Sequence, residues 1–300
     1  MNNALLYVVT VLVWGSTWFG IKFQLGEVDP ALSVVYRFTL AAVLLFAWCE
    51  LRGLKLRFSR RDHGYMALLG IFLFGLNYLL FYIATAHITS GLVAVTFAMI
   101  TMMNMLNGAL FLKTPVKLNV VGAVSLGLLG IALVFWPALT VFSLSDNRFA
   151  GLILCLLATY SASLGNIISA RNQLTGLPVI QANAFGMAYG AVLMFIYVLI
   201  ADIPINFSLN WLYMGSLLYL SLFGSVIAFG CYLTLIGRIG ANRAAYASLL
   251  FPLVALVIST AFEDYQWSGF ALTGVALILL GNVLILMPGR PHSDTLLTKK

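Results

Sequence analysis

Ten long apolar segments constrain the fold of this chain more than any other feature. Each has about 18 or more residues, enough for an α-helix to cross a bilayer core of roughly 30 Å. Of the 300 residues, 62% are hydrophobic and only 8% are charged, which excludes a water-soluble domain. The sequence therefore predicts an all-α integral membrane protein with ten transmembrane helices, numbered as spans 1–10, at residues 4–21, 30–49, 64–84, 90–112, 118–136, 149–170, 178–200, 209–235, 244–262 and 268–287.

Positive charges are distributed unevenly over the linkers between these spans. With the N-terminus placed in the cytoplasm, 13 of the 16 Lys and Arg residues fall on the cytoplasmic side, Lys22 and Arg148 fall outside, and Arg37 lies within span 2. Lys and Arg in short loops are retained in the cytoplasm, so we expect both termini there, in a bacterial inner membrane with lipid as neighbour. The net charge of +7 thus follows from topology and does not indicate a nucleic-acid partner.

The second half of the chain resembles the first. Residues 73–75 and 222–224 both read Leu-Phe-Gly. The segment GLLGIALVF, residues 127–135, parallels ILLGNVLIL, residues 278–286. Because five crossings is an odd number, two tandem five-helix copies must enter the membrane from opposite sides. The chain is therefore predicted to consist of two inverted five-helix repeats, at residues 1–140 and 147–290, followed by a cytoplasmic tail at 291–300.

The linkers after spans 4 and 9 occupy the same place in the two copies but carry opposite charge. The first has Lys113 and Lys117, and the second has Glu263 and Asp264. Lysines suit a cytoplasmic linker and carboxylates are tolerated outside, so inversion accounts for the reversal. Inverted repeats of this kind characterise secondary transporters, which bind substrate near the bilayer midplane between the two copies.

The paired pattern resembles the EamA branch of the drug/metabolite transporter superfamily over nearly the whole chain. The resemblance is carried by LVWGSTWFGIKF in span 1, by the arginine in VVYRFTLAA, and by GLNYLLFYIATAHITSGLVAV with its echo GSVIAFGCYLTLIGRIGANRAAYASLLFP. Within that branch the chain is most similar to the YddG-type exporters of aromatic and other amino acids. This implies a basket of ten helices in which spans 1, 3, 4, 6, 8 and 9 line a central cavity. Family copies often have a proline in the fourth helix, where this chain has Pro252 in copy two but Thr101 in copy one.

Aromatic and polar side chains form stripes along these spans at the spacing of one helical face. If the stripes converge, they make a pocket of rings, hydroxyls and thioethers, which suits an aromatic amino acid as substrate. The alternative for any single stripe is ordinary helix packing. The candidate substrate-binding residues are Trp14, Thr17 and Trp18 in span 1, Tyr78 and Tyr82 in span 3, Thr96, Met99 and Met103 in span 4, Tyr160 and Ser163 in span 6, and Asn242 and Tyr246 in span 9.

Two charged residues and one proline are candidates for gating or charge recognition. Arg37 is the only formal charge inside a predicted span. With Lys22 it can attract a substrate carboxylate, or it can snorkel outward or pair with Glu27 or Asp29. The structural role is favoured, because an arginine at this place recurs in the family whatever the substrate. Pro252 removes a backbone hydrogen bond within span 9, which gives either a hinge or a kink that neighbouring helices accommodate.

The sequence lacks the residues that several other functions require. No Asp, Glu or His falls within the predicted hydrocarbon depth, which disfavours proton pumping and export of cationic drugs and leaves Glu50 as the nearest candidate for coupling. No acid/base set or nucleophile of an enzyme is visible. Cys49, Cys155 and Cys231 fit neither a disulfide framework nor a metal site. We therefore expect no cofactor and no enzyme, but a monomeric or homodimeric exporter of neutral amino acids that works by alternating access.

Two readings remain as alternatives to that expectation. The first is export of another small metabolite or a lipophilic drug, and the second is a channel, which would show neither saturation nor acceleration by substrate on the far side. Gly186 and Gly190, spaced G-x-x-x-G in span 7, predict a close helix contact, or a dimer face instead.

Overall fold

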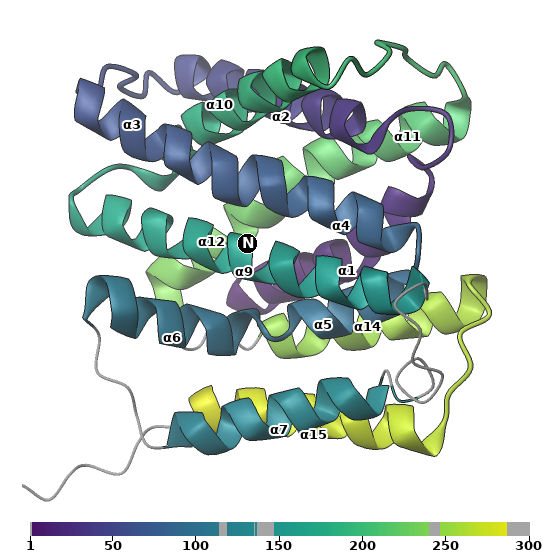
Figure 1. The fold of residues 1–300 in the computed structure, drawn as a ribbon. Coiled ribbons are helices and arrows are strands. Elements are labelled where there is room, and N and C mark those ends of the chain that lie inside the picture. The colour runs from purple at the N-terminus through teal and green to yellow at the C-terminus, as the bar shows by residue number, and fades with distance from the viewer. Residues whose placement is uncertain (1, 114–118, 135, 137–146, 240–246, 287–300) are drawn as a thin grey trace, which may run out of the picture.

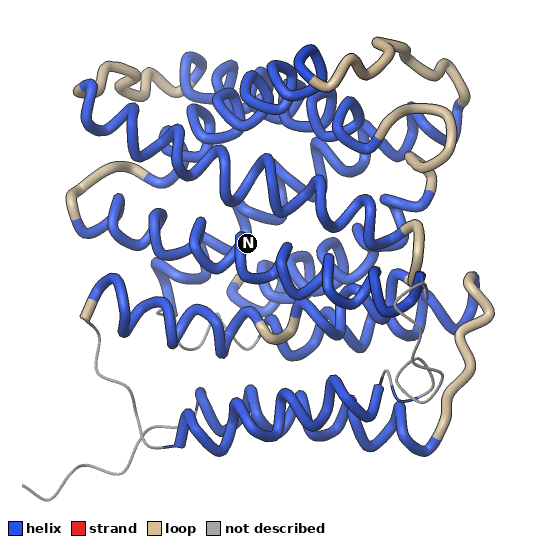
Figure 2. The backbone as a smooth tube through the Cα atoms, viewed as in Figure 1, coloured by secondary structure: helices blue, strands red, loops and turns tan. Residues whose placement is uncertain are grey.

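Helices are the only regular secondary structure in the described part of the chain. The structure is a computed structural model that describes residues 2–113, 119–134, 136, 147–239 and 247–286, none of which is in a strand. The helices lie side by side in one bundle (Figures 1 and 2). The elements are α1 (Asn3–Lys22), α2 (Pro30–Leu51), α3 (Arg60–Leu69), η1 (Gly70–Leu76), α4 (Asn77–Thr85), α5 (Ser90–Phe97), α6 (Ile100–Leu112), α7 (Asn119–Val134), α9 (Asn147–Leu174), α10 (Val179–Ile200), α11 (Trp211–Tyr219), η2 (Leu220–Ile227), α12 (Ala228–Ile239), α14 (Ala247–Phe262) and α15 (Gly269–Leu286).

Seven of the predicted spans coincide with helical runs that are long and apolar enough to cross a membrane. They are Asn3–Lys22, Pro30–Leu51, Arg60–Thr85, Ser90–Leu112, Asn147–Leu174, Val179–Ile200 and Trp211–Tyr232. The other three predicted spans contain shorter apolar helical segments, Ser125–Val134, Leu250–Phe262 and Gly269–Gly281. The chain is therefore a multi-pass membrane protein, as expected, while ten complete crossings stay a prediction.

Helices from the two halves of the chain interleave. α1 packs on α12 and α14, and α9 packs on α4, α5 and α6. α2 packs on α10 and η2, and α10 also packs on η1. α7 and α15 pair at one edge of the bundle (Figure 1). Each long helix of the first half therefore contacts the second half, so the centre of the bundle belongs to both.

Two spans contain a π-helical segment in the middle. η1 lies between α3 and α4, and η2 lies between α11 and α12. Both segments include the Leu-Phe-Gly triplet that the sequence repeats. A π-helical turn is rare and is frequently found at functional sites, because it redirects the side chains and backbone groups around it. These segments bring irregular backbone to the same place in spans 3 and 8.

The linkers emerge at two opposite ends of the bundle (Figure 1). At one end, the basic end, lie the linkers after α2 and α9 and the C-terminal end of α6, with Arg52, Lys55 and Arg57 after α2 and Lys113 after α6. At the other, the acidic end, lie the linkers after α1, α10 and α14, which carry Glu27, Asp202, Glu263 and Asp264. The segregation of charge agrees with the linker analysis, and the side that faces the cytoplasm stays a prediction.

Candidate functional site

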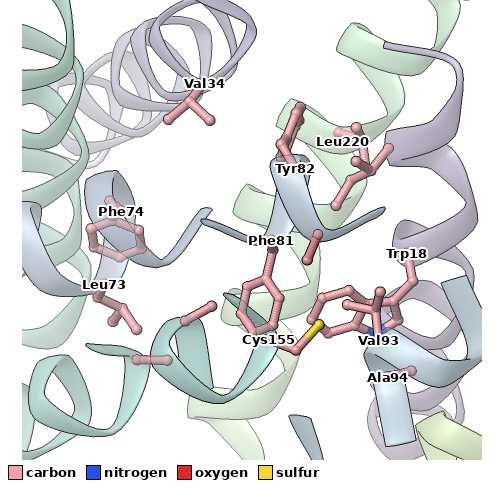
Figure 3. Close-up of a cluster of buried hydrophobic side chains, with 14 of the residues drawn as sticks. Trp18, Val34, Leu73, Phe74, Phe81, Tyr82, Val93, Ala94, Cys155 and Leu220 are labelled. Atoms are coloured by element: carbon pink, nitrogen blue, oxygen red, sulfur yellow. The ribbon is translucent and has the colours of Figure 1, made fainter. Parts of the chain in front are cut away.

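Aromatic rings meet at the centre of the bundle. Trp18 of α1 contacts Phe81 of α4 edge-on, with ring centroids 5.0 Å apart, and lies 5.3 Å from Phe97 of α5. Figure 3 shows Trp18 and Phe81 side by side among the buried side chains. Trp18 is only 9% exposed. Trp18 of the predicted span 1 stripe therefore meets span 3 through Phe81, which does not belong to the predicted Tyr78 and Tyr82 stripe.

The second half of the chain completes this group of rings. Trp14 lies 5.2 Å from Phe229 and 5.0 Å from Tyr232, both on α12. Phe251 of α14 lies 5.8 Å from Phe97. Edge-to-face and tilted ring pairs of this kind combine large contact area with specific geometry. We call the connected rings the central aromatic cluster, which consists of Trp14, Trp18, Phe81, Phe97, Phe229, Tyr232 and Phe251.

Arg37 of α2 is buried beside this cluster. Its side chain is 1% exposed, and its guanidinium carbon lies 4.5 Å from the centroid of the Tyr78 ring. The Nε group donates a hydrogen bond of 3.3 Å to Ser225 Oγ in η2. Nη1 has no hydrogen-bond partner among the described residues. Neutral groups alone, which are aromatic faces and the hydroxyls of Ser225 and Tyr82, thus contact a charge that lies within a membrane-spanning helix.

The two structural explanations offered for Arg37 do not hold. Snorkelling to water is incompatible with its burial. Glu27 accepts hydrogen bonds from Ser208 and Asn210 instead, and Asp29 accepts one of 2.8 Å from the backbone N–H of Ala31 at the start of α2. These carboxylates therefore serve the acidic-end linkers, and no described carboxylate forms a salt bridge with Arg37.

Gly224 is the point where α1, α2 and η2 meet. Trp14 Nε1 donates a hydrogen bond of 3.2 Å to the Gly224 carbonyl. A Cβ atom on Gly224 would lie 2.8 Å from Thr17 Cγ2 and 3.3 Å from Arg37 Nη2. The π-helical segment therefore places a backbone acceptor and a residue without a side chain between Trp14 and Arg37, which allows both to reach the same part of the interior.

Tyr82 connects α4 to the residues just after α1. Its ring is fully buried, and its hydroxyl donates a hydrogen bond of 2.5 Å to Gln24 Oε1. Gln24 is 1% exposed, and its Nε2 has no partner among the described residues. Tyr78 and Tyr82, which are one helical turn apart, therefore face Arg37 and Gln24 respectively.

Lys22 joins three segments at the acidic end. Its ammonium lies 3.4 Å from Glu263 Oε1 after α14 and donates a hydrogen bond of 3.2 Å to the Ile88 carbonyl. Glu263 also accepts from the backbone N–H of Ser90, at 3.0 Å from Oε2, and from the Ser90 hydroxyl. We call Lys22, Glu263 and Ser90 the Lys22 clasp. It links α1, α5 and α14, which are helices of both halves.

The candidates of spans 4 and 6 are spread over several environments. The Thr96 hydroxyl bonds the Leu92 carbonyl of its own helix. Met99 is buried and lies against Gly127 of α7, whereas Met103 is partly buried against the main core. Ser163 of α9 accepts a hydrogen bond of 2.8 Å from Asn107 of α6. Ser163 and Thr96 are therefore occupied by helix packing, and Met103 is the span 4 candidate that is still partly open.

The four remaining candidates have different outcomes. Tyr160 is 44% exposed on the side of α9 that also exposes Ile153 and Leu157, so it lies away from the central aromatic cluster. Pro252 is buried within α14, which continues as a helix past it. Asn242 and Tyr246 lie outside the described residues.

Several residues of this interior were not singled out from the sequence. Phe97, Phe229 and Phe251 belong to apolar runs that carry no distinguishing stripe, and Gln24 falls in a predicted linker. Ser225 follows the repeated Leu-Phe-Gly triplet, which is the one signal that pointed to its neighbourhood. Within the described ranges, no cluster of three or more His, Cys, Asp or Glu residues could hold a metal ion.

Glu27 makes the acidic-end linker 201–210 sensitive to acid. Hydrogen bonds from Ser208 and then Asn210 hold the pKa of the Glu27 carboxyl below its usual value. A lowered folded-state pKa contributes stability above the unfolded-state pKa, which is lost as pH falls through the folded-state value, below about 4.3. We expect the hydrogen-exchange protection factors of residues 203–210, which are corrected for the intrinsic pH dependence of exchange, to fall over that range. In Glu27→Gln this pH-dependent part should vanish, and an unchanged acid response would contradict the assignment.

The apolar spans, the interleaved halves and the charged, aromatic interior define the protein as a membrane transporter. The chain belongs to the EamA-like transporter family, whose sequence model matches residues 1–136 and 149–287.

Relatives of this class cover nearly the whole chain. The chain is 28% identical over 287 residues to the "Uncharacterized inner membrane transporter YedA" of Escherichia coli (strain K12), covering 93% of this chain and 90% of that protein. It is 25% identical to the "Uncharacterized transporter YoaV" of Bacillus subtilis (strain 168), covering 94% and 96%. A solved structure titled "Crystal structure of protein" has the same fold, with a TM-score of 0.67, 17% identity, and coverage of 94% and 95%.

Proposed function

We propose that the protein exports amino acids, aromatic and other neutral ones, with a specificity of the YddG type. The observation that carries this proposal is the central aromatic cluster beside a buried arginine. Rings from α1, α4, α5, α12 and α14 offer a planar solute contact from both halves of the chain. Trp and Tyr combine apolar area with a polar group, which suits the side chain of an aromatic amino acid.

Alternating access between two inverted repeats is the mechanism we propose. The helix contacts support it, because they pair in a symmetric way. α1 packs on α14 and α12, and its counterpart α9 packs on α5, α6 and α4. α2 packs on η2, and its counterpart α10 packs on η1. The two separate matches to the family model agree with this pairing. Such repeats transport by rocking one packing against the other around a central site.

We place the protein in a bacterial inner membrane with both termini in the cytoplasm. The support is the name of the Escherichia coli relative, "inner membrane transporter", and the concentration of Lys and Arg at the basic end of the bundle. Short linkers that are rich in Lys and Arg are retained on the cytoplasmic side of the membrane.

Exchange of labelled phenylalanine across liposomes that contain the purified protein tests this function. We expect saturable exchange that is faster with substrate on the far side and is competed by tryptophan and tyrosine. Absence of exchange relative to empty liposomes would remove the amino-acid proposal in favour of another metabolite or a lipophilic drug. Exchange that neither saturates nor responds to substrate on the far side would indicate a channel.

Trp14→Ala is expected to slow this exchange about tenfold, which corresponds to a loss of about 1.4 kcal/mol of substrate interaction. The reason is that Trp14 joins Phe229, Tyr232 and the Gly224 carbonyl at the centre. Tyr197→Ala is the control, because Tyr197 is 46% exposed on α10. An equal loss in both variants would argue against a role of the cluster in substrate binding.

A further inference from the structure

We propose that Arg37 binds the carboxylate of the transported solute, so that the central site selects monoanionic groups. This inference rests on the proposed function and names the chemistry of its site. Its starting point is a fully buried guanidinium with Nη1 unpartnered among the described residues.

A buried charge without a counter-ion is unfavourable in a membrane protein. Arg37 hydrogen-bonds to Ser225 Oγ and to the Tyr82 hydroxyl. It also lies over the faces of Tyr78 and Phe38, with the guanidinium carbon 4.5 and 5.4 Å from the two centroids. These contacts leave the positive charge without a neutralising group. An intramembrane ionisable residue normally pairs or faces a pathway for substrate. A solute carboxylate supplies both the missing acceptor and the missing charge, and arginine is the side chain best suited to bind it.

Two other unpartnered donors lie beside α4, the helix whose Tyr78 contacts Arg37. Trp18 Nε1 and Gln24 Nε2 are buried and have no acceptor within the described residues. Gln24 accepts a hydrogen bond from Tyr82, and Trp18 packs on Phe81. Both contacts are with residues of α4 that lie about one helical turn after Tyr78. Unpartnered donors from α1, from the linker after it and from α2 thus gather around α4. A buried donor is normally hydrogen-bonded, and together these groups need an acceptor.

The charge balance indicates a monoanion rather than a phosphate dianion. Arg37 contributes one unneutralised positive charge, while the nearby Trp18 and Gln24 donors are neutral. Lys22 of the acidic end is already paired with Glu263. A single carboxylate would balance the site. A solute with an amine and no carboxylate would bring a second positive charge beside Arg37 and should be rejected.

The test uses four probes with the same phenyl ring and the purified protein. Phenylalanine and phenylpropionate carry the carboxylate, whereas phenylalaninamide and phenethylamine lack it. Binding is measured from the rise in unfolding temperature as each probe is titrated. We expect the two carboxylates to bind at least about tenfold more tightly than the two amines, as charge-assisted pairs do. Equal binding of phenethylamine and phenylpropionate, or binding of no probe, would overturn the inference.

Variants separate recognition from a packing role. Arg37→Gln should reduce the preference for carboxylates to less than about threefold, while Arg37→Lys should keep part of it. Arg52→Gln is the matched control, because Arg52 is an exposed arginine at the far end of α2, over the Trp48 ring. A preference that persists in Arg37→Gln, or an equal loss for all probes, would contradict carboxylate binding.

The two proposals can fail separately. If Arg37→Gln does not fold, the wild-type preference and Arg37→Lys still decide the inference. A carboxylate preference without phenylalanine exchange would remove the amino-acid proposal and keep the inference. Exchange of phenylalanine with no preference between phenylpropionate and phenethylamine would do the reverse.

Discussion

Gly70→Ala is expected to lower the free energy of unfolding by about 1–3 kcal/mol, the cost of overpacking a close contact. A Cβ atom at this position would lie 2.6 Å from the Gly186 carbonyl oxygen and 2.7 Å from the Gly190 nitrogen. Both are backbone atoms of α10, so no side-chain rotation can relieve the clash, and the helices must separate. The G-x-x-x-G pair of span 7 therefore makes the close helix contact that its spacing predicts.

Gly215→Ala is the control for this prediction. Gly215 lies within α11, and a Cβ atom there would meet nothing within 4 Å. Alanine has the higher helix propensity, so this variant should be unchanged or slightly more stable. Unfolding of both proteins in detergent, followed by circular dichroism as temperature rises, compares them directly. Equal stability of the two variants would show that the η1–α10 crossing tolerates expansion.

Glu263→Gln is expected to lower the equilibrium constant for closing the acidic end by about tenfold or more. The substitution removes the partner of Lys22 and the charge that accepts from Ser90, and hydrogen bonds to charged groups contribute about 1.5–3 kcal/mol. Because the Lys22 clasp joins α1, α5 and α14, its loss should shift the proposed alternating-access equilibrium toward opening at this end. Labelling of a cysteine at Thr17, in a background without the native cysteines, by a membrane-impermeant maleimide should accelerate accordingly.

A double-mutant cycle checks that the clasp acts as one unit. Lys22→Met should also raise labelling, and adding it to Glu263→Gln should have little further effect, because coupled residues are not additive. Asp264→Asn is the matched control. Asp264 is the adjacent carboxylate, it is exposed, and its φ of 53° is one that asparagine tolerates. If labelling is also faster in Asp264→Asn, the effect comes from the loss of any negative charge at the acidic end and not from the Lys22 clasp.

Much of the architecture follows from composition and periodicity. Apolar runs of sufficient length must become helices in a membrane, because every backbone polar group needs a partner within its own segment. Seven spans were located in this way. The pairing of Trp14 with Trp18 on one face, and of Tyr78 with Tyr82 on another, also follows from the helical repeat alone.

The environments of the charged residues depended on the fold. From the sequence, Arg37 had Glu27 and Asp29 as nearby partners, yet both carboxylates bond linker or helix-end groups instead. Lys22 and Glu263 were noted separately, 241 positions apart by numbering, and meet only because α1 packs on α14. Contacts between segments so distant in the chain are fixed by tertiary packing.

The sequence by itself determined that this chain crosses the membrane repeatedly and which residues share a helical face. The tertiary structure decided which face of each helix points inward. Tyr160 and Trp18 were equivalent candidates, yet Tyr160 lies exposed and Trp18 lies in the cluster. In water an apolar stripe must turn inward, but lipid is as apolar as the protein interior, so hydrophobicity does not distinguish the two faces. Close packing between helices makes that choice.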